Sequence, residues 1–483
     1  MELNRSTLAR VPAAARPRTD APAAGIVHLG LGAFHRAHQA VFTEDAMAAA
    51  GGDWGIVGVA PRSPDVFEAM RAQDGLFSVT TLDPAGNSTR VIGSSAGQLR
   101  AAADPDAVVA LLADPAIKIV TLTVTEKGYK LDAATGRLLL DDDLRADLET
   151  GRPPQTVPGL LIRGLCARRR ADAGPIALAS CDNLPANGHR LRGLIDKLAA
   201  ATAIGDWVRE TVTFPGSMVD RIVPATTPVT LAGAAQALGV RDQAAVNGEP
   251  YSAWVIEDDF PAGRPAWEQA GAVMTSDARP WERLKLRTLN GVHSAIAYLG
   301  GVAGESTIAG ALELPGMREV VRQYIACDVA PSFEPPPGVD TIAYGEEVLT
   351  RFENPAIEYQ TVQVAMDGSQ KMPQRVLQTV QDRLAAGHVP RWGALVVAAW
   401  MRFVQGSTDD GRALPLNDPL ADRIRAHLAA APSTPDGVAD ALLGLDTVFT
   451  PALAEDAGFR AALVEWLTAF EKHGVAATLA GAA

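Results

Sequence analysis

Four polar side chains lie along one predicted helix that is otherwise rich in leucine and valine. A buried lysine in such a helix loses its charge more easily than an exposed one, so its pKa can fall from about 10.4 toward neutrality. Lys285 could then work as a general acid/base. At about 100° per residue the four positions share a sector of roughly 140°. A lysine that extends to solvent, a capped asparagine and a satisfied core histidine would give the same pattern. The four residues are Glu282, Lys285, Asn290 and His293.

A glycine-rich turn near the start of the chain has the form of a nucleotide-binding loop. Gly30 and Gly32 form G-x-G after an apolar run and before a predicted helix. Glycine lets the backbone turn tightly and approach a pyrophosphate, whose charge then lies at the helix N-terminus. The third glycine of the full motif is replaced by His35, so an ordinary strand–helix turn remains an alternative. Phe34 and Arg36 belong to the same loop, and Arg36 could add a cation for the phosphates.

The residues after the second predicted strand bear on the choice of cofactor. An acid at this point accepts hydrogen bonds from the ribose hydroxyls of NAD and repels the 2′-phosphate of NADP. Asp65 is the candidate acid, whereas Arg62 nearby could attract that phosphate. Asp65 could equally cap the helix predicted over 66–72.

A dinucleotide and an acid/base together suggest hydride transfer at a secondary alcohol, which also needs donors for the developing oxyanion. The three cysteines and eight histidines show no zinc-ligand spacing, so we expect no metal. None of the six tyrosines has a lysine four residues later, so the Tyr-x-x-x-Lys pair of short-chain dehydrogenases is missing. The helix that carries Lys285 is the remaining candidate.

The elements that must position these residues change in type along the chain. Strands are predicted over 26–31, 55–59, 119–124, 176–180 and 254–257, and helices over 37–50 and 160–170. This alternation predicts an α/β domain with a mainly parallel sheet. Later, helices are predicted over 283–300, 316–326, 373–384, 391–405 and 459–473. We predict a Rossmann-type nucleotide-binding domain over 1–280, a mostly α-helical substrate and catalytic domain over 281–483, and an active site between them.

Composition bears on partners and location. Of 483 residues, 47% are hydrophobic and 20% are charged, as in ordinary globular proteins. The net charge of −13 disfavours nucleic acid or an acidic membrane as partner. Sparse cysteines, no signal-peptide core at the start and no apolar run of roughly 18–20 residues favour a cytoplasmic protein. We therefore expect a small-molecule substrate.

Several blocks resemble the mannitol dehydrogenase family, the long-chain polyol-specific dehydrogenases. The loop at 30–39 and the pattern Lys285-x4-Asn290-x2-His293 match two family motifs, and further blocks match in family order at 180–188, 218–221, 254–258 and 367–371. The likeness covers nearly the whole chain. It implies a zinc-free and generally monomeric dehydrogenase, and the match of Asp65 to the family's acid implies NAD.

The resemblance also implies a role for each matching residue. Lys285 matches the catalytic general acid/base, and Asn183 and Asn290 match the two amides that polarise the carbonyl and hold the oxyanion. His293 matches a ligand of a substrate hydroxyl, and Glu282 matches a carboxylate that assists proton exchange with solvent. The residues that match the substrate pocket are Lys371 and Asp220.

Within the family, the chain most resembles the fructuronate reductases, also called D-mannonate oxidoreductases. The shared stretches are 123–129, 218–225 and 363–375. Mannitol enzymes tend to have Gly where Lys127 stands and Arg where Gln363 stands. One departure is Glu358-Tyr359-Gln360, where the reductases carry basic residues, and it weakens the case for an acidic substrate.

Two substrates therefore remain open, and we favour the first. This is a sugar acid, with D-fructuronate reduced reversibly to D-mannonate by NADH. The second is a polyol, with mannitol oxidised to fructose or arabinitol to xylulose. A non-catalytic protein on the same fold would lack a catalytic residue, yet all three implied ones are present. The cations that could bind the carboxylate of a sugar acid are Lys127, Lys371 and Arg375.

Overall fold

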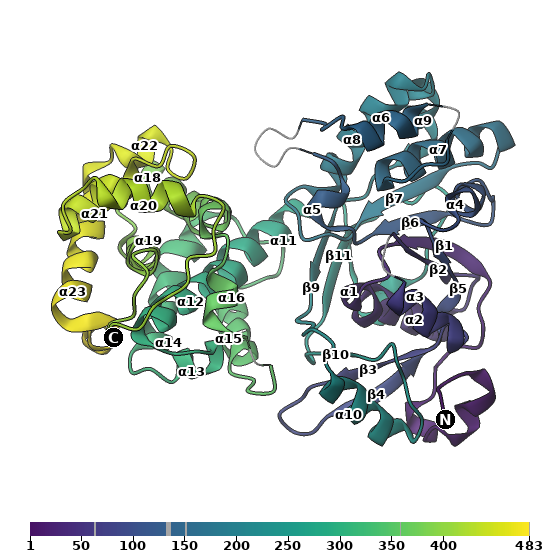
Figure 1. Ribbon diagram of the computed structural model, residues 1–483, viewed down its shortest axis with the longest axis horizontal. Coiled ribbons are helices and arrows are strands. Elements are labelled where there is room, and N and C mark those ends of the chain that lie inside the picture. Colours follow the sequence, from purple (N-terminus) through teal and green to yellow (C-terminus); the bar gives the residue numbers. More distant parts are fainter. Residues whose placement is uncertain (62–63, 132–136, 150–151, 358, 483) are drawn as a thin grey trace. The chain divides into compact units, whose positions relative to one another are not determined.

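The computed structural model (Figure 1) describes residues 1–61, 64–131, 137–149, 152–357 and 359–482. They divide into two compact units, Met1–Arg279 (unit 1) and Pro280–Ala483 (unit 2). Arg62, which could favour NADP, and Glu358, which weakens the case for an acidic substrate, lie outside the described residues.

Unit 1 is built on a six-stranded parallel sheet with the strand order β5-β2-β1-β6-β7-β8. This confirms the predicted Rossmann-type α/β fold. The strand order reverses between β1 and β6, so their carboxyl ends form the switch point at which such sheets bind ligands. The strands are β1 (Ala24–Leu29), β2 (Gly55–Ala60), β5 (Ser95–Arg100), β6 (Ile119–Leu122), β7 (Ile176–Ser180) and β8 (Val212–Thr213).

The central strands contribute to hydrophobic cores on both faces of this sheet. On one face Val27 and Leu29 pack in a core with the apolar residues of α4, α7 and α8. On the other face Ile26 packs in a core with α2 and the buried tryptophans 254 and 267. This two-sided burial explains the continuous Val- and Ile-rich runs. The helices named are α2 (Gln39–Ala50), α4 (Pro105–Leu112), α7 (Val157–Ala171) and α8 (Asn187–Ala201).

Local backbone conformation explains two differences between the predicted and the observed elements. β1 ends at Leu29, two residues early, because Gly30 has a φ of 116° and turns the chain out of the sheet. The helix predicted over 37–50 is divided at His38 (φ −126°, ψ −88°) into α1 (Ala33–Ala37) and α2. The strand predicted over 254–257 exists as β11 but belongs to a separate sheet.

Two three-stranded sheets complete unit 1. The first has the order β10-β3-β4 and the second has the order β12-β11-β9. The second sheet matters for the site because β9 ends at Asp220. The strands are β3 (Phe77–Thr81), β4 (Ser88–Ile92), β9 (Ser217–Asp220), β10 (Val246–Gly248), β11 (Ala253–Glu257) and β12 (Val273–Thr275).

The elements of unit 2 are all helices in its described part, joined by loops in which only isolated bridges occur. The predicted helical domain is therefore confirmed. Its centre is the buried pair α12 (Gly291–Ala303) and α19 (Arg391–Phe403), which pack against each other and against α23 (Ala457–Ala482). No helix within the described ranges combines the length and hydropathy needed to cross a membrane.

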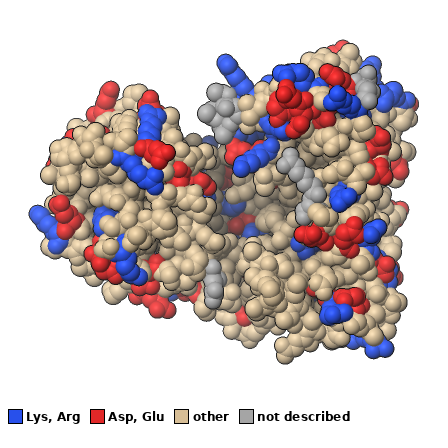
Figure 2. Space-filling model, viewed as in Figure 1, with Lys and Arg blue, Asp and Glu red and all other residues tan. Residues whose placement is uncertain are grey.

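Acidic and basic side chains are interspersed on the face that Figure 2 presents. Many charged side chains of the molecule form ion pairs, such as Arg460 with Asp440 at 2.7 Å and Arg322 with Glu346 at 2.7 Å. Exposed pairs of this kind contribute only about 0–1 kcal/mol each. They matter here as the background against which cations without an acidic partner stand out.

Candidate active site

In unit 1, the two glycines of the turn after β1 play different parts. A Cβ on Gly30 would lie 2.1 Å from the carbonyl oxygen of Thr123, so only glycine allows β1 and the end of β6 to come this close. A Cβ on Gly32 would meet nothing within 4 Å, so the backbone there borders open space. No side chain caps the start of α1, which leaves its first N–H groups for another acceptor. This turn fits the pyrophosphate of a dinucleotide.

The other predicted loop residues pack against unit 1 itself. Arg36 is 4% exposed and donates hydrogen bonds to the carbonyl oxygens of Ala244 and Gly32. Burial lowers its pKa to about 10. Its guanidinium thus supports the backbone of the turn, a role that the sequence did not suggest. Phe34 is half-buried and stacks on His38 with ring centroids 5.0 Å apart.

Asp65 is exposed and is the first residue of α3 (Asp65–Ala72), one position after the N-cap. The N-cap is Pro64, and no side chain makes a capping hydrogen bond there. The alternative role of Asp65 as a helix cap is therefore wrong. Its carboxylate follows the carboxyl end of β2, the strand next to β1, where dinucleotide folds place the acid that binds the ribose.

Lys127 and Asn183 follow the carboxyl ends of neighbouring strands, β6 and β7. Both side chains are exposed in unit 1. Lys127 lies on the short helix α5 (Thr125–Gly128), and Asn183 directly follows the buried Asp182. Asp220, the last residue of β9, is 6% exposed. The sheet therefore gathers Lys127 and Asn183 at one edge.

In unit 2, the helix predicted over 283–300 contains a π-helical segment at its centre. The segment η4 (Lys285–Asn290) separates α11 (Arg279–Leu284) from α12. In a regular α-helix, Lys285 and Asn290 would be about 140° apart. Hydrogen bonds from i to i+5 widen the turn, so residues five positions apart lie closer to one face. Glu282 is half-buried on α11, three residues before Lys285.

Lys285 and Asn290 are both buried, each 6% exposed. The acid/base interpretation requires a buried lysine, and Lys285 is buried. The Nδ2 atom of Asn290 is also buried and has no hydrogen-bond partner within the described part of the chain. An unsatisfied buried donor costs about 1–3 kcal/mol, so its amide is available for a ligand.

His293 lies one turn further along the same helix, against aromatic rings. Its ring stacks on Phe352, with centroids 4.5 Å apart, and makes a T-shaped contact with Tyr359, with centroids 5.2 Å apart. Burial, helped by the charges of Arg375, Lys371 and Arg351, lowers its pKa to about 3, so the imidazole is neutral. Its Nε2 atom is buried without a hydrogen-bond partner among the described residues. The alternative of a satisfied core histidine is therefore not supported.

Two cations reach this part of unit 2 from a second segment. Lys371 lies on α17 (Gly368–Met372) and Arg375 on the π-helix η7 (Pro373–Leu377). Arg375 donates to Ser294 Oγ on α12 at 3.1 Å. Burial, and then the charge of Arg375, lowers the pKa of Lys371 to about 8. Neither cation forms an ion pair with any residue in the described ranges, in contrast to the paired surface arginines.

Close backbone contact joins these two segments. A Cβ on Gly291 would lie 2.9 Å from the carbonyl oxygen of Arg375 and 3.2 Å from the hydroxyl of Tyr324. Glycine at this position therefore lets the helix with Lys285 pack directly on η7. The sequence did not suggest these π-helical segments or this contact, because neither changes the hydrophobic period that predicts a helix.

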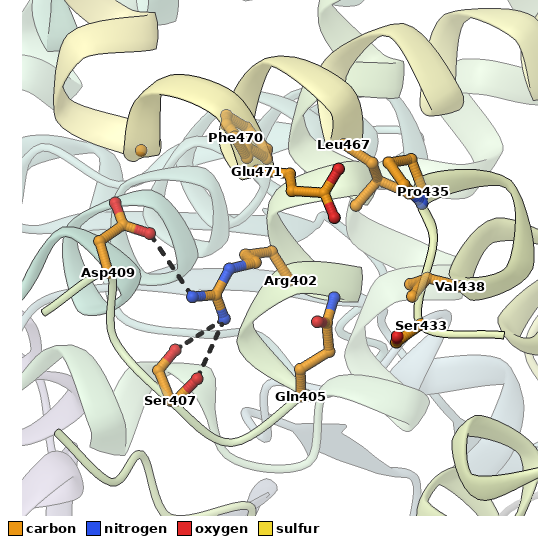
Figure 3. A pocket seen from close by; sticks show the side chains of 11 residues that line it. Arg402, Gln405, Ser407, Asp409, Ser433, Pro435, Val438, Leu467, Phe470 and Glu471 are labelled. Carbon is orange, nitrogen blue, oxygen red and sulfur yellow. Dashed lines mark hydrogen bonds and ion pairs between the residues drawn. The ribbon is translucent and has the colours of Figure 1, made fainter. Parts of the chain in front are cut away.

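A separate cavity of unit 2, about 310 Å³ in volume, is shown in Figure 3. Arg402 points into it and is held by Asp409 at 3.5 Å and by the carbonyl oxygen of Ser407 at 2.8 Å. Glu471 and Phe470 line it from α23. None of the predicted site residues lines this cavity. No group of three or more His, Cys, Asp or Glu residues within the described ranges is arranged to hold a metal ion.

Comparison with known proteins agrees with the division of the chain. Residues 24–269 match the mannitol dehydrogenase Rossmann domain, and residues 277–471 match the mannitol dehydrogenase C-terminal domain. D-mannonate oxidoreductase of Escherichia coli (strain K12) is 41% identical over 444 residues, which cover 90% of each chain. Mannitol 2-dehydrogenase of Cereibacter sphaeroides is 39% identical over 416 residues, 85% of this chain and 87% of that one.

A solved structure extends the likeness over the whole length. Mannitol 2-dehydrogenase of Pseudomonas fluorescens, in ternary complex with NAD and D-mannitol, has a TM-score of 0.85 and 34% sequence identity. The match covers 100% of this chain and 99% of that one. The resemblance seen in the sequence is thereby confirmed. The chain belongs to the mannitol dehydrogenase family of oxidoreductases.

Proposed function

We propose that the protein is an NAD-dependent dehydrogenase that interconverts D-fructuronate and D-mannonate, with Lys285 as its general acid/base and no metal. The observation that supports a sugar acid as the substrate is the pair of cations Lys371 and Arg375. These are cations beside His293 that have no ion-pair partner in the described part of the chain. The carboxylates of Asp367 and Asp418 raise the pKa of Lys371 without forming an ion pair with it, so a substrate carboxylate would be its direct partner.

NAD is the cofactor that the residues of unit 1 suit. The Gly30–Gly32 turn would hold the pyrophosphate, and the exposed carboxylate of Asp65, which does not cap α3, would accept hydrogen bonds from the ribose and repel a 2′-phosphate. When bound, NAD accepts a hydride from the secondary alcohol and NADH returns it to the ketone. A comparison of kcat/KM with NAD and NADP, in the wild type and in Asp65→Ala, checks this choice. A wild-type preference for NADP would contradict it.

Proton transfer belongs to Lys285. In oxidation its neutral amine takes the proton of the reacting hydroxyl, and in reduction its ammonium gives a proton to the oxygen. Lys285 is 6% exposed, so its amine lies within the protein and not on the open surface of unit 2. Glu282, half-buried and three residues earlier, would pass the proton to solvent.

Two amides would stabilise the negative charge on the reacting oxygen. Asn290 carries a buried N–H group without a partner in the described ranges, which is the form that a preorganised oxyanion donor takes before its ligand arrives. Asn183 would be the second donor, since its side chain is exposed at the carboxyl end of β7. His293 is neutral, and its Nε2 atom has no hydrogen-bond partner among the residues that the structure describes, so it would hydrogen-bond a neighbouring substrate hydroxyl.

Three cations are proposed to discriminate a sugar acid from a polyol. A charge-assisted hydrogen bond contributes about 1.5–3 kcal/mol, or roughly ten- to a hundred-fold in preference. Lys371 and Arg375 are the candidates in unit 2, and the exposed Lys127 is the candidate in unit 1. Asp220 would accept a hydrogen bond from a hydroxyl of the substrate.

A polyol such as mannitol is the second candidate substrate. The departure at Tyr359-Gln360 favours it, because the reductases carry basic residues there. The Tyr359 ring makes a T-shaped contact with His293, so this segment is close to a predicted substrate ligand. A hydroxyl-rich chain would be satisfied by the same neutral donors.

The deciding experiment measures kcat/KM for D-mannonate and for D-mannitol in the wild type, Lys127→Ala and Arg375→Gln. Arg322→Gln, which removes a paired surface cation, is the matched control. We expect D-mannonate to be preferred, and Lys127→Ala or Arg375→Gln to reduce that preference by ten-fold or more. A wild-type preference for mannitol would replace the sugar acid by the polyol. An unchanged ratio in both variants would place the carboxylate contact elsewhere.

A further inference from the structure

The carboxylate of Asp182 joins the two chain segments that leave β6 and β7. It is 7% exposed and accepts three hydrogen bonds from the β6 side. The backbone N–H groups of Val124 and Thr125 donate at 3.1 and 2.8 Å, and the hydroxyl of Tyr129 donates at 2.7 Å. Tyr129 is 2% exposed, so this network lies inside the protein.

The direction of the network follows from the acceptor-only nature of a carboxylate. Because the Tyr129 proton points to Asp182, the hydroxyl of Ser180 must be the donor in its 2.6 Å contact with Tyr129. The chain of hydrogen bonds therefore runs from Ser180 through Tyr129 to Asp182. It returns to the strand from which Asp182 emerges, and so it fixes α5 to β7.

The segment after β6 needs this support because its backbone is unfavourable. Thr125 has a φ of 64°, in the left-handed region that a β-branched residue rarely adopts. Its N–H group is one of those that Asp182 binds. Backbone strain of this kind persists where the surroundings determine the conformation, and it is frequent at functional sites.

The main chain of Asp182 is held as firmly as its side chain, and Asn183 lies in the turn that results. The carbonyl oxygen of Asp182 accepts from the N–H group of Leu184 at 2.8 Å, which closes a three-residue turn with Asn183 at its centre. The same oxygen accepts from Nδ2 of the buried Asn187 at 3.1 Å. The position of Asn183 therefore depends on Asp182 through a single peptide bond.

We infer that Asp182 is a positioning residue for Asn183, which places the amide donor for the reacting oxygen and couples it to the segment that carries Lys127. This inference rests on the proposed role of Asn183. It assigns to Tyr129 and Ser180 the orientation of the Asp182 carboxylate. None of the three residues needs to touch the substrate.

The test uses four variants. They are Asp182→Asn, Asn183→Ala, the double variant that combines these two changes, and Tyr129→Phe. Asp147 supplies a matched control in the same unit. It is 2% exposed and also accepts from two backbone N–H groups and one hydroxyl, those of residues 155 and 156. The measurements are kcat, KM, the dissociation constant of NADH, the melting temperature, and the primary deuterium isotope effect with substrate deuterated at the reacting carbon.

We expect Asn183→Ala to lower kcat by about 10²–10³-fold, the usual loss for one oxyanion donor. Asp182→Asn should lower kcat by about 10- to 100-fold, raise the isotope effect and leave NADH binding intact. The double variant should be no slower than Asn183→Ala, because Asp182 acts through Asn183. Asp147→Asn should lower the melting temperature with kcat unchanged. Tyr129→Phe, which removes one hydroxyl, should show a smaller form of the Asp182→Asn effect. If Asp182→Asn does not fold, Tyr129→Phe provides the test.

Three results separate the inference from the proposed function. Normal kcat in Asp182→Asn and Tyr129→Phe beside an impaired Asn183→Ala would overturn the positioning role alone, as would losses that multiply in the double variant. Full kcat in Asn183→Ala would overturn the proposed role of Asn183 itself.

Discussion

At the scale of single residues, the site in unit 2 combines buried donors that keep free hydrogen-bonding capacity with cations that lack an acidic partner among the described residues. Asn290 and His293 supply the first, and Lys371 and Arg375 supply the second. Both features cost stability when no ligand is bound. That cost is the mark of groups retained for binding, and it separates these residues from the paired arginines of the surface.

The lowered pKa of Lys371 gives the site a measurable pH dependence. With a pKa of about 8, its side chain is mainly an ammonium below pH 8 and mainly a neutral amine above it. We therefore expect KM for D-fructuronate to rise as the pH passes above 8, approaching ten-fold per pH unit. In Lys371→Met, KM should be high throughout and lose this rise. The same rise in Lys371→Met would show that another group controls substrate binding.

At the scale of elements, the sheet and its helices could be predicted from hydrophobic period, because burial on one or both faces determines that pattern. The period predicts β1, β2, β6 and β7 of the main sheet and five helical segments of unit 2, but it misses β5, β8, α15 (Thr341–Phe352), α20 (Ala421–Ala429) and α21 (Pro435–Leu443). The pattern leaves open whether Lys285 is buried or extends to solvent, because a lysine on a leucine-rich helix can do either. The π-helical segments and the role of Arg36 could not be predicted, because they depend on contacts with residues far away in sequence, such as Ala244.

Packing between elements makes opposite predictions for two glycines. Gly291→Ala would place a Cβ 2.9 Å from the backbone of η7, and overpacking of this kind costs about 1–3 kcal/mol. Gly193→Ala, inside α8, meets nothing within 4 Å and should stabilise unit 1 by about 0.5–1 kcal/mol. Thermal and urea unfolding of both variants checks the signs. We also expect kcat to fall in Gly291→Ala only, because η7 carries Arg375. Equal stability changes would contradict this account of the contact.

At the scale of the whole molecule, each unit contains a neutral histidine that makes folding sensitive to acid, fully buried in unit 1 and half-buried in unit 2. The pKa values of His28 in unit 1 and His293 in unit 2 are both lowered to about 3 by burial, against 6.5 in the unfolded chain. Between pH 6.5 and 3 the unfolded state therefore binds more protons. The contribution of each histidine to stability is complete above pH 6.5 and falls by up to about 1.4 kcal/mol per pH unit below it.

Urea unfolding of unit 2 at several pH values between 7 and 4 measures this effect. His293→Asn should reduce the pH slope of the free energy of unfolding by up to about 1.4 kcal/mol per unit. His473→Asn, which changes an exposed histidine on α23, should leave the slope as it is in the wild type. A wild-type slope in His293→Asn would mean that His293 is not a neutral group in the folded protein.

The role of Lys285 is the central claim, and the pH dependence of turnover in Lys285→Ala tests it most directly. With NAD and D-mannonate, the wild-type rate should rise with pH as the amine becomes neutral and then level off. With NADH and D-fructuronate, it should fall at high pH as the ammonium is lost. Lys285→Ala should be about 10²–10⁴-fold slower in both directions, and its rate should show neither the rise nor the fall with pH. Its affinity for NADH should be intact. Lys472→Ala, which changes an exposed lysine of unit 2, should match the wild type. Near wild-type turnover, or the same two pH limbs, in a folded Lys285→Ala protein would contradict the account.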